Sequence, residues 1–431
     1  MTNTSVKKYP RYKDSGIAWI GKIPAEWHTI KFKYCFLITG GNGFSEFLQG
    51  NNSGEIPFCK CSDINDTYKI FVDRAKNYIS KKCCIDNNFN LIPANSILIA
   101  KIGEALKKNH RKINSLPCCI DNNMEAFTLK RNDNNLYYFY VLNCVDMLWF
   151  DNGGTIPSVN NEKLKNFKLP WTTKFEQQVI VDYLDEKCGA IDKTIETEEK
   201  VIEKLKEYKQ SLITETVTKG LDKSVPMKDS GIAWIGSIPE GWKVLRHKYI
   251  LRKVKEICEK YNGEDIISLT MKGVIKRDLD NPMGKMPLTF DGYQKIYAGN
   301  LLLCLFDIDV TPRCVGLIKD NGLTSPAYSQ FKFLGKDSPQ YYTYLLTALD
   351  DDKCLLHLSK NLRSSLSEDS FGAILTIQPP LKEQQAIADY LDDKCAKIDK
   401  AIADKEQVIE KLTEYKKSLI YECVTGKRMV A

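Results

Sequence analysis

The sequence predicts an α/β (α+β) fold with two globular domains, separated by two long antiparallel helices that form a coiled coil with an internal pseudo-two-fold repeat. Three observations lead to this prediction. The stretch KDSGIAWIG occurs at Lys13–Gly21 and again at Lys228–Gly236. Two segments that begin at Glu176 and Glu383 agree at most positions without a gap. The blocks 28–175 and 243–382 differ in sequence, but both contain short apolar runs between Gly, Pro, Asn and Asp residues.

The order of these segments divides the chain into four regions. They are an N-terminal head with a first domain (1–172), a central long helix (173–220), a linker with a second head and domain (221–380), and a C-terminal long helix (381–431). Each domain holds short apolar runs, such as SILIAKIG and NLLLCLF, bounded by Gly, Pro, Asn and Asp. These runs predict strands. Each domain also holds one helix with an aromatic stripe, NLYYFYVLNCVDMLWF or SPQYYTYLLTALDD, which indicates core packing.

The two repeated segments are predicted to be helices because they contain no proline and are rich in Glu, Lys, Leu and Ile. Their heptad spacing predicts a coiled-coil interface, whose residues are Leu184, Ile191, Ile195, Glu198, Ile202, Leu205, Leu212, Leu391, Ile398, Ile402, Lys405, Ile409, Leu412 and Leu419. Glu198 and Lys405 are equivalent and lie near the middle of each helix. In an antiparallel pair these opposite charges would meet and fix the register. Two independent solvated side chains are the alternative.

The ends of the chain resemble the linker between its halves. VTKGLDKSVPMKDSG joins the first long helix to the second head, and the C-terminal VTGKRMVA and N-terminal TSVKKYPRYKDSG look like that linker cut open. We therefore expect the two termini to lie close together.

Composition narrows the class of protein. The chain has 431 residues and 43% hydrophobic side chains, a mean hydropathy of −0.33, and no apolar run long enough for a membrane span. The N-terminus has no apolar signal region, so we expect a cytoplasmic protein without membrane contact. The 15 cysteines include no Cys-x2–4-Cys pair. Buried free thiols are therefore favoured over a zinc site.

The net charge of +7 is unevenly distributed. The basic excess lies in the two domains, whereas residues 176–220 are net acidic, which suggests a polyanion bound at two places. The candidate DNA-binding residues are Lys101, Lys107, Lys108, His110, Arg111 and Lys112 in the first domain, and Lys272, Lys276, Arg277, Arg313, Lys360, Asn361 and Arg363 in the second. Lys would contact phosphates, and Arg and Asn can read base edges. For each residue, an ordinary solvated surface position is the alternative.

Motifs for catalysis are scarce. The chain has no G-x-x-x-x-G-K-[ST] loop and no Gly-rich dinucleotide or methyl-donor motif, and its four histidines show no spacing for a metal site or a triad. We therefore expect a binding and positioning protein that has no catalytic residue, no metal and no cofactor of its own.

The repeated heads KDSGIAWIGxIPxxW and tails KEQQAIADYLDDK, together with GGTIPSVNNEKLKNFKLP, resemble the specificity subunit of type I restriction–modification systems. The resemblance implies two target-recognition domains that each read one half of a split site in double-stranded DNA, and helices that set the unread gap. It also implies two methylase subunits, restriction subunits attached through the methylase core, and S-adenosylmethionine, ATP and Mg2+ used by those partners. The methyltransferase and endonuclease activities belong to the assembled complex, and this chain is non-catalytic.

Two other classes of protein stay open at this point. A sequence-specific DNA-binding regulator with tandem recognition domains would show the same basic blocks, and co-purification with a methyltransferase subunit would distinguish it. A coiled-coil scaffold without DNA is the other, and steep salt-dependent retention on DNA would count against it.

Overall fold

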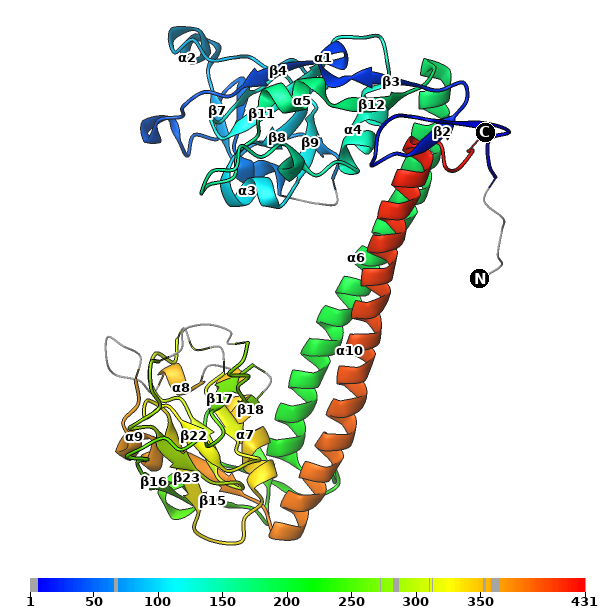
Figure 1. Ribbon diagram of the computed structural model, residues 1–431. Helices are drawn as coiled ribbons and strands as arrows, with labels where there is room; N and C mark the ends of the chain where they lie inside the picture. Colours follow the sequence, from blue (N-terminus) through cyan, green and yellow to red (C-terminus); the bar gives the residue numbers. More distant parts are fainter. Residues whose placement is uncertain are drawn as a thin grey trace. The chain divides into compact units, whose positions relative to one another are not determined.

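The computed structural model describes residues 7–65, 69–271, 273–281, 287–309, 311, 313–351, 354–357 and 365–430. The fold is mixed α/β and forms two compact units, Met1–Glu198 with Gln407–Ala431 and Glu199–Glu406 (Figure 1). Each unit therefore contains one domain and part of both long helices.

The two long helices are confirmed. Helix α6 runs over Lys174–Lys219 and α10 over Leu381–Val424. Gly220 follows α6 and Gly426 lies just beyond α10, both at positive φ, the conformation that ends helices and favours glycine. The α10 helix begins directly after Pro379-Pro380, because proline is compatible with a helix start but not with its interior.

The core of the first unit is a five-stranded sheet in the order β4-β11-β8-β9-β6. Its strands are β4 (Phe36–Gly40), β11 (Met124–Leu129), β8 (Ile97–Ala100), β9 (Arg111–Asn114) and β6 (Phe71–Val72). All neighbours are antiparallel except β9 and β6. The predicted strand in SILIAKIG is β8, and its four residues are buried on both faces, which explains its unbroken apolar run.

The remaining strands of the first unit form smaller sheets: β10 (Cys119–Ile120), β5 (Ile56–Cys59) and β7 (Asn77–Ile79); β1 (Tyr12–Asp14) and β2 (Lys22–Pro24); and β3 (His28–Lys31) and β12 (Lys168–Trp171). Its short helices are α1 (Phe32–Cys35), α2 (Lys81–Asp86), α3 (Gly103–Lys107), α4 (Asn135–Asn143) and α5 (Asn161–Asn166). Single 3-10 turns occur at Glu46–Leu48, Cys61–Ile64 and Met147–Phe150.

The second unit contains a four-stranded antiparallel sheet in the order β16-β23-β20-β21. Its strands are β16 (Leu251–Val254), β23 (Ser329–Phe333), β20 (Leu301–Leu303) and β21 (Val315–Leu317). The two-stranded pairs are β13 (Met227–Asp229) with β14 (Ser237–Pro239), β15 (Lys243–Arg246) with β24 (Leu375–Gln378), β17 (Ile267–Thr270) with β18 (Gly273–Lys276), and β19 (Gln294–Ile296) with β22 (Gly322–Thr324). Its short helices are α7 (Pro339–Asp351), α8 (Cys354–His357) and α9 (Glu368–Ala373), with a 3-10 turn at His247–Tyr249.

The predicted aromatic helices correspond to α4 and α7. The first is shorter than predicted, because α4 ends at Asn143 and Met147–Phe150 form a separate 3-10 turn in which Trp149 is exposed. The aromatic residues within α4 and α7 are confirmed as core. Tyr137 and Tyr138 in α4 are fully buried, as are Tyr341 and Tyr342 in α7. The side chain of Asn134 caps α4 by accepting hydrogen bonds from the backbone of Leu136 and Tyr137. In each unit this helix belongs to the same apolar core as the adjacent parts of the long helices.

Candidate nucleic-acid interface

The carboxylate of Glu176, in the first turn of α6, holds the N-terminal head against this helix. Tyr9 donates its hydroxyl to Oε1 at 2.7 Å, and Trp27 donates Nε1–H to Oε2 at 3.0 Å. The Thr172 hydroxyl also donates to Oε2. Burial, and then the bond to Glu176, raise the pKa of Tyr9 well above its usual value. The phenol therefore stays protonated and keeps its role as a donor.

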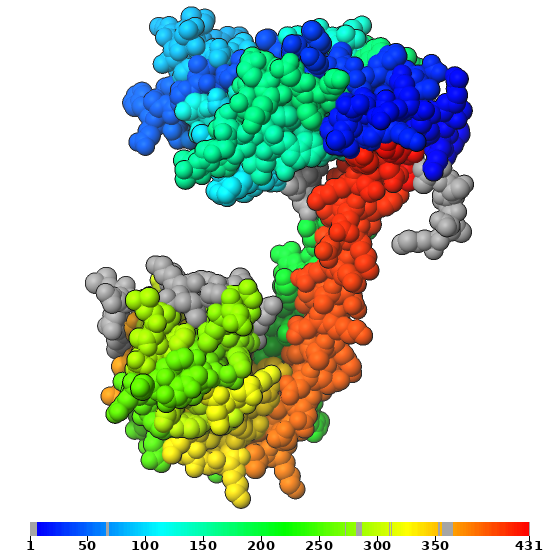
Figure 2. Space-filling model, viewed as in Figure 1, coloured from blue at the N-terminus to red at the C-terminus, as the bar shows by residue number. Residues whose placement is uncertain are grey.

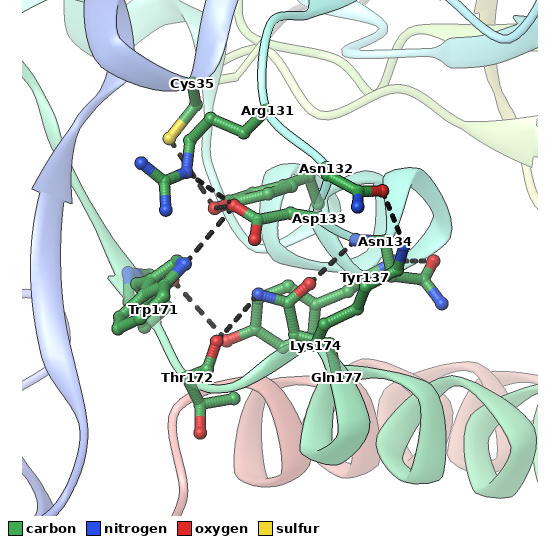
Figure 3. Close-up of polar contacts among 12 residues, drawn as sticks. Cys35, Arg131, Asn132, Asp133, Asn134, Tyr137, Trp171, Thr172, Lys174 and Gln177 are labelled. Atoms are coloured by element: carbon green, nitrogen blue, oxygen red, sulfur yellow. Dashed lines mark hydrogen bonds and ion pairs between the residues drawn. The ribbon is translucent and has the colours of Figure 1, made fainter.

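A second buried carboxylate, Asp133, joins three segments of the first domain just before α4 (Figure 3). Its Oδ2 accepts hydrogen bonds from Arg131 Nε at 2.8 Å, the Tyr138 hydroxyl at 3.1 Å and Trp171 Nε1 at 3.2 Å. Because Trp171 ends β12 and Tyr138 lies in α4, this carboxylate fixes the angle between the helix and the strand that leads into α6.

The start of α6 is tied to the start of α4 through amide side chains (Figure 3). Gln177 is fully buried. Its Nε2 donates to the Thr172 carbonyl at 2.9 Å, and its Oε1 accepts from the Asn134 backbone at 2.8 Å. Lys174 Nζ donates to Asn132 Oδ1 at 2.6 Å. Both the Nε2 donor and the Oε1 acceptor of Gln177 therefore have backbone partners. Removal of this side chain would leave those buried backbone groups without a partner and would destabilise the fold.

Helix α4 also contacts both long helices of its unit. The Tyr137 hydroxyl donates to the Val424 carbonyl at the end of α10 at 3.3 Å, and the Tyr140 hydroxyl donates to Asp185 of α6 at 2.5 Å. The first part of α6 and the last part of α10 therefore both pack against α4.

The second unit uses the same kinds of contact at the corresponding positions. Trp242 Nε1 donates to Glu383 Oε2 at 2.9 Å, and Gln384 Oε1 accepts from the Ser338 backbone at 2.8 Å. The Tyr341 hydroxyl donates to the Val217 carbonyl at 2.9 Å, and the Tyr344 hydroxyl to Asp392 at 2.6 Å. Helix α7 thus contacts α10 and α6 as α4 contacts α6 and α10.

Each unit contains an ion pair between the long helices. In the first, Lys416 Nζ lies 2.6 Å from both carboxylate oxygens of Asp192. In the second, Lys209 Nζ lies 2.7 and 2.6 Å from those of Asp399. Lys209 and Lys416 are equivalent in the two repeated segments, as are Asp192 and Asp399. The two ion pairs therefore repeat one contact with the roles of the helices exchanged.

The apolar residues predicted for the helix interface are buried or half-buried, from Leu184 to Leu212 in α6 and from Leu391 to Leu419 in α10. The predicted adjacency of the two chain ends is confirmed. The Met429 backbone donates to the Lys7 carbonyl at 2.8 Å, and Lys427 Nζ donates to the Lys22 carbonyl. In the second unit, Lys219 Nζ donates to the Ser237 carbonyl, the position equivalent to Lys22.

Three of the candidate DNA-binding residues lie on the surface around α3. Lys101 directly follows β8 and is 3.9 Å from the buried carboxylate of Glu125. Lys107 is exposed and pairs with Glu104 at 2.5 Å. Lys108 is exposed. Lys101 is half-buried, whereas the exposed side chains of Lys107 and Lys108 are available to an anion from solvent.

The other three candidates of this run point into the protein. Arg111 is buried, and its guanidinium donates to Asn109, Asn143 and the Val145 carbonyl. Burial lowers its pKa to about 10, so it stays charged. Lys112 is also buried, and His110 is half-buried. Because Arg111 is bonded within the domain, its role in this structure is to hold β9 against the end of α4.

The candidates of the second unit divide in the same way. Lys276 is exposed and pairs with Asp265 at 2.6 Å, whereas Arg313 is mostly buried and lies 3.6 Å from Asp351. Arg277 is half-buried. Lys272, Lys360, Asn361 and Arg363 lie outside the described residues.

Sequence reasoning missed the pairs that attach the heads to the helices, Trp27 with Glu176 and Trp242 with Glu383. Each partner occurs at the same place in both copies of its repeated segment. That recurrence was a usable signal, because a buried Trp needs an acceptor for its Nε1–H.

The described part of the chain contains neither a cluster of metal ligands nor a membrane-spanning helix. No group of three or more His, Cys, Asp or Glu side chains in these ranges is placed to hold a metal ion. Within the same ranges, no helix combines the length and the apolar character needed to cross a membrane.

The chain is similar in sequence to proteins of known family. Residues 24–207 match the type I restriction modification DNA specificity domain. The chain is 28% identical over 42% of its length to the type I restriction enzyme EcoR124I/EcoR124II specificity subunit of Escherichia coli. It is 25% identical over 54% of its length to the type I restriction enzyme MjaIX specificity subunit of Methanocaldococcus jannaschii. The alignments span about half of these two relatives, 45% and 53%.

One solved structure shares the fold. It is described as the structural basis of complex assembly and conformational transition of the type I R-M system. The match has a TM-score of 0.65 at 12% identity and covers 93% of this chain and 98% of that one. The chain is thus similar to type I restriction–modification specificity subunits over residues 24–207 and over about half of two relatives, and it shares the fold of this solved structure.

Proposed function

We propose that this chain is the DNA sequence-specificity subunit of a type I restriction–modification complex. Each domain would read one half of a bipartite site in double-stranded DNA, and the two long helices would set the unread gap. One observation carries the proposal: the docking of a domain on the long helices, through Trp, Gln and Tyr contacts, recurs in the second unit. Because a split DNA site has two half-sites, it needs two domains that are attached to the long helices in the same way.

The architecture that we propose is a pseudo-two-fold repeat in which α6 and α10 form an antiparallel coiled coil. The equivalent ion pairs Asp192–Lys416 and Asp399–Lys209 support it, as do the same strand order in the two main sheets and the burial of the heptad positions. In this arrangement the midpoint residues Glu198 and Lys405 would meet, which stays a prediction.

We further propose that the subunit has no catalytic residue and binds no cofactor itself. Two methylase subunits would assemble with it and bring S-adenosylmethionine, and restriction subunits would join through the methylase core with ATP and Mg2+. The complex would act in the cytoplasm. The names of the matched relatives and the absence of a nucleotide-binding motif from the sequence support this assignment.

Among the candidate DNA contacts, the proposal keeps the exposed Lys107, Lys108 and Lys276 and the half-buried Lys101, for which phosphates are the natural ligands. Lys272, Lys360, Asn361 and Arg363 remain candidates by their chemistry. Arg111 and Lys112 become supporting residues because of their burial.

Mapping of methylated bases tests the function. DNA is exposed to this chain together with its methylase subunit, and the modified adenines are sequenced. We expect a split motif with one methylated adenine in each half. Exchange of residues 243–382 for the corresponding block of another family member should change one half only. An undivided motif, or a change in both halves, would contradict the two-domain assignment.

A further inference from the structure

A large cleft lies within the first unit, between the domain and the long helices. Its volume is about 1190 Å3. The domain side is formed by the segment around Lys108 and His110 and by α4, and the helix side by α6 and the last part of α10. In the space-filling view the domain lies directly beside this part of α10, drawn in red (Figure 2). The cleft is therefore bounded by two parts of the domain and by both long helices.

Lysines without an ion-pair partner face this cleft from both sides. Among the described lining residues, four are exposed lysines with no ion pair: Lys69, Lys108, Lys193 and Lys417. Lys108 follows α3, Lys193 lies in α6 and Lys417 in α10. A cationic side chain from each of three elements thus borders one volume.

Two of the acidic residues in the cleft are already engaged. Asp185 accepts the Tyr140 hydroxyl, and Asp192 holds Lys416 with both oxygens. The side chain of His110 also borders the cleft, and its Nδ1 is buried without a hydrogen-bond partner. Burial and the nearby Lys108, Lys112 and Arg111 lower the pKa of His110. The domain side of the cleft is consequently a region of positive potential.

We propose that this cleft holds the phosphodiester backbone of the unread DNA between the two half-sites, with Lys108, Lys193 and Lys417 as phosphate contacts. The inference rests on the proposed function and adds a role for the helices beyond spacing. Lys193 and Lys417 lie on α6 and α10, the helices that would set the unread gap. Phosphate contacts suit this position because they contribute affinity and register without reading sequence.

The test uses the full chain assembled with its methylase subunit and a duplex that carries the mapped site. Binding is measured by fluorescence anisotropy at several salt concentrations. For the double variant Lys193→Gln and Lys417→Gln, the salt slope should fall by about two, one unit for each lost phosphate contact. Replacement of the gap phosphates by neutral methylphosphonates should weaken binding of the wild type. It should weaken binding of the double variant less, because that variant keeps only the Lys108 contact of the three.

Lys206→Gln is the matched control, because Lys206 is also exposed on α6 but does not line the cleft. It should keep the wild-type slope. An equal number of methylphosphonates outside the site should leave the difference between wild type and double variant intact. Circular dichroism verifies the helix content of each variant.

Two results would overturn the inference while leaving the proposed function standing. One is an unchanged salt slope in the double variant. The other is loss of methylase assembly in the double variant with an unchanged slope, which would make the cleft a protein-docking site. If the wild type binds no specific duplex, the proposed function itself fails, and this inference falls with it.

Discussion

The indole Nε1 of Trp27 donates a hydrogen bond to Oε2 of Glu176 across 3.0 Å, although the two residues belong to different repeated segments of the chain. The same carboxylate accepts from Tyr9 and Thr172. Three hydrogen bonds at the start of α6 therefore converge on one side chain.

Glu176→Ala should destabilise the first unit by on the order of 2–3 kcal/mol, because it leaves part-buried donors without an acceptor. Urea unfolding followed by tryptophan fluorescence measures the change. Glu186→Ala is the control, since Glu186 is exposed on the same helix and pairs only with its neighbour Lys187. An equal decrease in the free energy of unfolding of both variants would show that the Glu176 hydrogen bonds do not stabilise the first unit.

The Asp192–Lys416 ion pair should couple α6 to α10 by about 1 kcal/mol, as expected for a partly exposed pair. A double-mutant cycle with Asp192→Asn and Lys416→Met, read by thermal unfolding, gives this coupling directly. The equivalent cycle at Asp399 and Lys209 should give a similar value. A coupling free energy of zero at both sites would show that the ion pairs do not fix the register of the two helices.

A circular permutant opened near Lys223, with residues 1 and 431 joined by a short linker, should fold and direct its methylase subunit to the same site. The reason is that Met429 and Lys7 are already hydrogen-bonded. Methylation mapping and circular dichroism provide the readouts. A permutant with native helix content but a different site would count against the repeat, and a permutant that does not fold would count against the joined ends.

The second unit should lose stability in acid through His247. This residue is fully buried, its Nδ1–H donates to the Phe371 carbonyl at 3.2 Å, and burial lowers its pKa to about 4. In the unfolded chain, His247 takes up a proton near pH 6.5. Above that pH the neutral, buried His247 therefore makes its full contribution to the free energy of unfolding. This contribution falls by roughly 3 kcal/mol as the pH drops toward 4.

His247→Phe is the matched variant for this prediction, because Phe32 occupies the equivalent position in the first unit and is also buried. Between pH 4 and 6.5, the free energy of unfolding of the second unit should depend less on pH in the variant. The same pH dependence in both proteins would assign the effect to other groups.

The elements that could be predicted from sequence are those with a local signal. The long helices follow from heptad spacing and from the prolines and glycines at their ends, and β8 from its unbroken apolar run. The burial of Tyr137 and Tyr341 follows from the aromatic stripe of each helix. Each of these patterns is complete within a few turns of chain, so no distant partner is needed to interpret it.

The basic run from Lys101 to Lys112 shows where this reasoning ends. The sequence alone suggests a single basic cluster on the surface, but β9 begins at Arg111 and passes between β8 and β6. Its charged residues are therefore buried, and Arg111 is satisfied by the Val145 carbonyl and by Asn143. The acceptors come from the end of α4 and the residues after it, more than thirty positions away, and no local pattern reveals them.

The attachment of a domain to α6 at three places, Glu176, Gln177 and Asp185, has a consequence for the rotational phase of the helix. A domain held in this way cannot turn about the helix axis without breaking all three contacts, so it must follow every rotation of the residues beneath it. Each inserted residue turns the helix by about 100° and lengthens it by about 1.5 Å. Insertions of four or seven residues return to within roughly 40° and 20° of the starting phase, whereas two residues turn the domain to the far side of the helix.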